Sequence, residues 1–84
     1  MTRKEIIGIL GQILYESTQG RIDPSTIDET TDLLSETGLD SIEALDILLK
    51  TEESFNIQVE DEDMNRNLFN SVSTIVEYIE TKRA

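Results

Sequence analysis

The chain has 84 residues, which is enough for one small domain, and we expect that domain to span residues 1–84. It carries 18 acidic and 7 basic side chains, and a net charge of −11 argues against nucleic acid or membrane partners, which are bound through Lys and Arg. Without Cys or His it has no disulfide, no thiolate metal site and no histidine base, which argues against a stand-alone hydrolase.

The first predicted element is an amphipathic helix. Thr2 and Glu5 have the spacing of a capping box, and apolar residues then recur at helical spacing through Leu14. We therefore predict a helix from residue 3 to residue 17. The segment lacks the unbroken apolar core of a signal peptide, and no run in the chain is long enough to cross a membrane. These features predict a soluble cytoplasmic protein.

A long polar connection follows, from residue 19 to residue 39. Gly20, Pro24 and a cluster of Asp, Glu and Thr interrupt any continuous helix there. Four apolar residues should hold this loop to the core, namely Ile22, Ile27, Leu33 and Leu34. We expect one short helical turn over residues 32–37, and Gly38 gives the backbone freedom needed before the next helix.

The second long helix is predicted over residues 41–55. Asp40 is a good N-cap, and Glu43 completes an acidic version of the capping box. Winding the segment at helical pitch puts one set of residues on the core side: Ala44, Ile47, Leu48, Thr51 and Phe55. Ile42 and Leu49 fall on the opposite, acidic side, where the domain's own core does not use them. This apolar pair is a candidate contact surface.

The last third of the chain predicts a short helix and a final long one. Residues 56–60 suggest an extended connection, and Asp61-Glu62-Asp63 suggests a short third helix that ends near Asn67. Ser71 or Asn70 should cap the last helix. The predicted fold is all-α, a four-helix bundle with a short third helix and a long first loop. The acids after Glu60 do not form an EF-hand, because Arg66 stands where that loop needs Gly, and we expect no metal site.

Ser41 lies where the long loop becomes the second helix. The free N–H groups and the positive end of the dipole at a helix start favour a phosphate there. The plain alternative is a helix-start serine with no modification. Because the chain has no His to activate this hydroxyl, any modification of Ser41 requires another enzyme.

Gly38-Leu39-Asp40-Ser41-Ile42-Glu43 resembles the Gly-x-Asp-Ser-Leu signature of acyl carrier proteins, and the resemblance runs over nearly the whole chain. It implies a carrier-protein domain of acyl-carrier type that is not an enzyme. The serine of that family receives 4′-phosphopantetheine from coenzyme A through a phosphopantetheinyl transferase. By resemblance, Ser41 is the attachment residue and Asp40 belongs to the cofactor-binding site. The arm would hold acyl intermediates as thioesters for enzymes of lipid, fatty-acid, polyketide or other secondary-metabolite biosynthesis.

The resemblance also implies a surface for partner enzymes with basic patches. We call it the docking face, and it consists of Ile42, Glu43, Asp46, Leu49, Glu52 and Glu53. Contacts to the arm or cargo are expected from Val59, Met64 and Leu68, although plain core packing is the favoured role for Met64 and Leu68.

Two departures from the family pattern stand out. Thr51 replaces a usually apolar core residue, which predicts looser packing of the second helix, and the segment between Phe55 and Val72 is longer than in common fatty-acid carriers. The longer segment suggests a specialised, free-standing member of the family, and we expect it to be a monomer. Two other readings stay open at this point. One is an aminoacyl or peptidyl carrier, and the other is an unmodified acidic interaction domain of the same fold.

Overall fold

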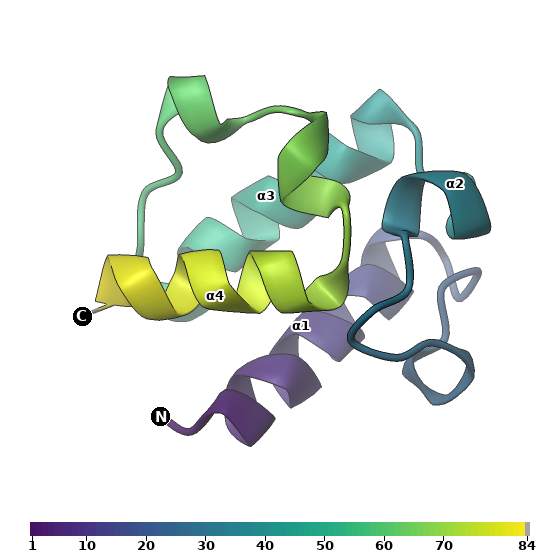
Figure 1. Ribbon diagram of the computed structural model, residues 1–84, viewed down its shortest axis with the longest axis horizontal. Helices are drawn as coiled ribbons and strands as arrows, with labels where there is room; N and C mark the ends of the chain where they lie inside the picture. Colours follow the sequence, from purple (N-terminus) through teal and green to yellow (C-terminus); the bar gives the residue numbers. More distant parts are fainter. Residues whose placement is uncertain (84) are drawn as a thin grey trace.

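The computed structural model describes residues 1–83, with the side chain of Arg66 left out of the description. These residues form four α-helices and three short 3-10 turns, and none of them forms a strand. In chain order the elements are α1 (Arg3–Ser17), η1 (Pro24–Thr26), α2 (Leu33–Thr37), α3 (Ser41–Phe55), η2 (Asp61–Asp63), η3 (Arg66–Phe69) and α4 (Val72–Arg83). Figure 1 shows the three long helices packed together, and the predicted all-α bundle is confirmed.

α1 begins and ends where its sequence predicts. The capping box is formed, since the Thr2 hydroxyl accepts from the backbone N–H of Glu5 and the Glu5 carboxylate accepts from that of Thr2. Its apolar stripe packs against both α3 and α4. Gly11 is buried against the first loop, where an added Cβ would lie 3.0 Å from Pro24 Cγ. A larger residue at Gly11 would therefore push the loop away from α1.

The long first loop is held to the core by its apolar residues. Ile22 and Leu33 are buried, while Ile27 and Leu34 pack against the core from its edge. The expected helical turn is α2, whose N-cap Asp32 accepts from the N–H groups of Leu34 and Ser35. Gly38 then ends α2 with a φ of +69°, a left-handed conformation that glycine adopts without strain. This turn sets the direction in which the chain enters α3.

The expected short third helix is divided into two 3-10 turns, η2 and η3. Asp61-Glu62-Asp63 starts a helical turn as predicted, but the chain is extended again at Asn65, with φ −140° and ψ 176°. The Asn65 side chain accepts from the N–H of Asn67 and starts the second turn. Asn side chains compete with helix hydrogen bonds in this way, so the local cap at Asn65 interrupts the helix that the acids favoured.

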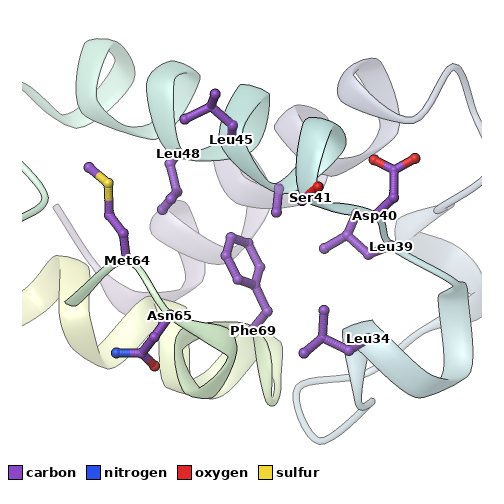
Figure 2. Close-up of a pocket in the computed structure, with 10 residues that line it drawn as sticks. Leu34, Leu39, Asp40, Ser41, Leu45, Leu48, Met64, Asn65 and Phe69 are labelled. Atoms are coloured by element: carbon purple, nitrogen blue, oxygen red, sulfur yellow. The ribbon is translucent and has the colours of Figure 1, made fainter. Parts of the chain in front are cut away.

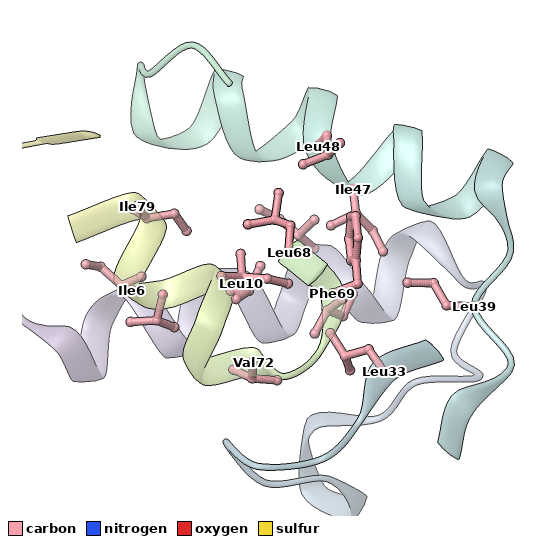
Figure 3. Close-up of a cluster of buried hydrophobic side chains, with 14 of the residues drawn as sticks. Ile6, Leu10, Leu33, Leu39, Ile47, Leu48, Leu68, Phe69, Val72 and Ile79 are labelled. Carbon is pink, nitrogen blue, oxygen red and sulfur yellow. The ribbon is translucent and has the colours of Figure 1, made fainter. Parts of the chain in front are cut away.

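Apolar side chains from all the long helices meet in one core. Figure 3 shows Ile6 and Leu10 of α1, Ile47 of α3 and Ile79 of α4 converging between the helices, with Leu68 beside them. The Thr51 hydroxyl is buried among them and donates to the carbonyl of Ile47 at 2.7 Å, so it is satisfied within its own helix. Among residues 1–83, no helix is both long and apolar enough to cross a membrane.

Candidate functional site

Ser41 is the first residue of α3, and it is exposed. The N-cap Asp40 accepts from the N–H of Glu43 at 2.8 Å, and the Glu43 carboxylate accepts from the N–H of Asp40. The first donor within the helix is Ala44, whose N–H reaches the Asp40 carbonyl. The N–H groups of Ser41 and Ile42 therefore have no acceptor among the described residues. A phosphodiester at Ser41 fits this end of a 15-residue helix, because free N–H groups and the helix dipole both favour an anion.

Ser41 stands at the edge of an apolar cavity of about 650 Å³, which we call the Ser41 cavity. Figure 2 shows Met64 and Phe69 reaching from the segment before α4 toward Leu45 and Leu48 of α3, with the Asp40 carboxylate pointing away. Seven of its ten lining residues are aliphatic or aromatic: Leu34, Leu39, Ala44, Leu45, Leu48, Met64 and Phe69. The remaining three are Asp40, Ser41 and Asn65. The cavity can take an apolar chain that starts from the Ser41 side.

Of the three residues expected from the sequence as arm or cargo contacts, Met64 alone lines this cavity. Met64 is 37% exposed at its rim. Val59 and Leu68 lie in the core instead, 3% and 6% exposed. They are buried because the connection after α3 and the η3 turn both direct these side chains inward. They pack in the core and do not line the Ser41 cavity, so a contact of either residue with the arm or cargo stays a prediction.

Sequence reasoning missed most of the lining. Leu45 is half exposed one turn after Ser41, and its spacing of four residues on a helix could have indicated a shared side. Phe69 and Leu34 come from other elements, and only the folded chain brings them next to α3. No spacing in the sequence signals that approach.

The docking face separates into exposed apolar residues and acids with different surroundings. Ile42 is 80% exposed and Leu49 is 51% exposed, so the apolar pair predicted from the sequence does lie outside the core. Leu45, also 51% exposed, lies between them. Glu53 is exposed and forms no ion pair with any residue from 1 to 83 whose side chain is described.

The other three acids of the docking face already have partners within the chain. Glu43 accepts hydrogen bonds from the two terminal guanidinium nitrogens of Arg21, at 2.5 and 2.7 Å. This bond lowers the pKa of the Glu43 carboxyl below its ordinary value. Asp46 pairs with Lys50 at 3.1 Å, and the Glu52 carboxylate accepts from the backbone N–H of Val59 at 2.8 Å. Fewer carboxylates of the docking face are therefore open to a cation of a partner protein than the sequence suggests.

Comparison with known proteins agrees with this geometry. The family model of the phosphopantetheine attachment site matches residues 4–79. An acyl carrier protein of Rhodococcus erythropolis is 34% identical over 83 residues, which cover 99% of this chain and 87% of the relative. The chain belongs to the acyl carrier protein family. A Thermotoga maritima acyl carrier protein is 31% identical over 96% of this chain and 95% of its own length. A Phytoplasma mali acyl carrier protein is 39% identical over 79% and 76%.

Membership of the acyl carrier family fixes the general activity. The protein is a carrier and not an enzyme, and its prosthetic group is a covalently bound 4′-phosphopantetheine. Acyl carrier proteins work with a phosphopantetheinyl transferase and with biosynthetic enzymes. The acyl carrier reading is favoured over an unmodified interaction domain or an aminoacyl carrier. Among the described residues, no group of three or more acids is arranged to hold a metal ion.

Proposed function

We propose that Ser41 is the attachment residue of this acyl carrier and that Asp40 holds it in place. The observation that supports this most directly is the exposed hydroxyl at the first residue of α3, beside the Ser41 cavity. Asp40 fixes the start of α3 through its bond to the N–H of Glu43, and Gly38 fixes the turn before it. Ser41 therefore has a defined position on a rigid helix, while its side chain stays open to a transferase.

In the proposed attachment step, the Ser41 oxygen forms a bond to the pantetheine-side phosphorus of coenzyme A. The bond from that phosphorus to the oxygen bridging the two phosphates breaks, and adenosine 3′,5′-bisphosphate leaves. The Ser41 proton passes to a base of the transferase, because this chain has no His near Ser41 or elsewhere. Once attached, the arm supplies a thiol that holds acyl groups as thioesters. The free N–H groups of Ser41 and Ile42 are the groups that would hold the phosphate charge at the start of α3.

The lining of the Ser41 cavity supports acyl cargo over aminoacyl or peptidyl cargo. A polar amino acid or peptide would leave its N–H and carbonyl groups without partners against Leu39, Leu45, Leu48 and Phe69. An alkyl chain has no polar group to leave unpaired there and gains from leaving water. We propose that Met64, at the rim of the cavity, contacts the cargo or the arm.

We further propose that the docking face delivers the cargo to basic patches on lipid or secondary-metabolite enzymes. This is supported by the exposed Ile42 and Leu49, since apolar residues that a core does not use are candidates for contact. It is also supported by the charge of the region. Fourteen acids and one base, Lys50, lie between Asp23 and Asp63, and such a surface attracts basic partners over long range. Within this proposal the carrier acts as a cytoplasmic monomer with one domain.

The attachment residue is tested by the intact mass of the purified chain after incubation with coenzyme A and a permissive phosphopantetheinyl transferase. We expect one phosphopantetheinyl group on the wild-type chain and none on Ser41→Ala. Ser54→Ala is the matched control, because Ser54 is an exposed serine near the other end of the same helix. It should be modified like the wild type. Full modification of Ser41→Ala would overturn the assignment of Ser41.

A further inference from the structure

Arg21 is the basic residue that closes the acidic side of α3 near Ser41. It lies in the first loop, 22 residues before its partner Glu43. Its two terminal nitrogens hold both carboxylate oxygens of Glu43, and its Nε donates to the carbonyl of Thr37 at 3.1 Å. This is the fork geometry in which Arg binds carboxylates most strongly. The Glu43 side chain is left only 18% exposed.

Arg21 is held in the position in which it covers Glu43. Its bond to Thr37 ties the guanidinium to the end of α2, and Glu43 is itself held by the capping box with Asp40. A cation of a partner protein can reach the Glu43 carboxylate only by displacing a preformed, two-point contact. Asp46 is covered in a weaker way by Lys50, one turn along the same helix.

The covered acids leave an apolar surface next to the attachment residue. Ile42 and Leu45 lie within the first turns of α3 and are 80% and 51% exposed. Glu53, which forms no ion pair with any side chain that the structure describes, lies near the far end of the helix. The docking face thus presents apolar groups near Ser41 and open negative charge away from it.

We propose that Arg21 is a specificity-determining residue, which acts as an internal counter-ion of Glu43 and favours partners that meet the Ser41 end of α3 with an apolar surface. This inference rests on the proposed docking face. A partner whose basic residues lie opposite Glu43 competes with Arg21 and loses affinity, whereas a partner with its cation opposite Glu53 does not. Charge complementarity with α3 is therefore set by which acids are open, and not by the acid count of the sequence.

The test measures the dissociation constant between the apo chain and a basic phosphopantetheinyl transferase, without coenzyme A, at low and at physiological salt. Arg21→Gln should lower Kd at low salt by about two- to fivefold, the range expected for freeing one exposed carboxylate. It should also make Kd rise more steeply with salt. Arg3→Gln is the matched control. It removes the same charge from ion pairs with Glu29 and Glu80, away from α3, and should leave Kd close to the wild-type value.

Two further variants separate the possible failures. If the docking face is used, Ile42→Ala and Glu53→Gln each raise Kd; if neither does, the docking face and this inference fail together. If both raise Kd but Arg21→Gln behaves like Arg3→Gln, only the role of Arg21 is overturned. Arg21→Lys keeps the positive charge at position 21 but loses the two-point contact with Glu43, and it keeps the proposal testable if Arg21→Gln does not fold. The Kd of a folded Arg21→Lys chain should decrease, but by less than that of Arg21→Gln. A Kd of Arg21→Lys equal to the wild-type value would also contradict the proposal.

Discussion

Replacing Tyr78 by Phe removes one hydroxyl that holds the wall of the Ser41 cavity to α4. The hydroxyl donates to the Asp63 carboxylate at 2.8 Å and accepts from the N–H of Glu60 at 3.2 Å. Both partners belong to the η2 region, directly before Met64 at the cavity rim. Burial and the bond to Asp63 also raise the pKa of Tyr78 above its ordinary value, so the hydroxyl stays protonated at neutral pH.

The expected loss of stability is small because the partners of the hydroxyl can turn to water. A net hydrogen bond contributes roughly 0.5–1.5 kcal/mol, and one to a charged group can contribute roughly 1.5–3 kcal/mol. Asp63 is half-buried and Glu60 is exposed, so water competes for both bonds and favours the lower end of the first range. The two bonds together should stabilise the fold by about 1 kcal/mol. For a domain of this size, that loss lowers the melting temperature by roughly 4–8 °C.

Thermal and urea unfolding followed by circular dichroism measure the global loss, and amide hydrogen exchange measures the local one. We expect exchange to speed up most over residues 60–65 and only slightly in α1 and α3. Tyr15→Phe is the control, because the other tyrosine is 44% exposed on α1 and should change neither measurement. A loss above about 3 kcal/mol, or equal exchange over residues 60–65 in both variants, would refute this reasoning.

Three other substitutions test separate parts of the structure. Asp40→Ala removes the N-cap of α3 and should cost about 1 kcal/mol in urea unfolding; no loss would mean that the capping box does not stabilise the helix. Ile47→Ala, in the core, should cost about 2–5 kcal/mol, while Leu45→Ala, at the cavity, should cost under about 1 kcal/mol; equal costs would contradict the two-sided helix. Because the pKa of Glu43 is lowered in the fold, its pair with Arg21 stabilises the protein above the ordinary pKa of 4.5, and this stabilisation is lost as the pH falls through the lower, folded value. The stability gap between wild type and Arg21→Gln should therefore be present at pH 7 and close in acid, and a gap that stays constant down to pH 2 would exclude the pair as its cause.

The long helices could be predicted from the sequence because their signals are local. Each signal lies within one or two helical turns: a capping box, at Thr2 or at Asp40, followed by apolar residues at helical spacing. Both helices start in the structure at the predicted residues. The third helix was less predictable. Its acids favour a helix start, whereas the competing cap is a single side chain, that of Asn65.

Two parts of the site depend on contacts between distant segments, which periodicity does not record. The Ser41 cavity needs Phe69 and Leu34 to approach α3 from two other elements. The cover of Glu43 needs Arg21, placed there by the bond to Thr37 and the turn at Gly38. The sequence alone showed an acid at Glu43, but it did not show that this carboxylate forms an ion pair with Arg21. The structure therefore differs from the sequence-based expectation more in the surface around Ser41 than in the positions of the long helices.

Fragmenting the modified chain in a mass spectrometer locates the arm on the chain. If Ser41 carries the arm, N-terminal fragments ending before residue 41 keep their unmodified mass, and every N-terminal fragment that includes Ser41 gains one phosphopantetheinyl group. Added mass that first appears at any other serine or threonine would contradict attachment at Ser41, even with a correct intact mass.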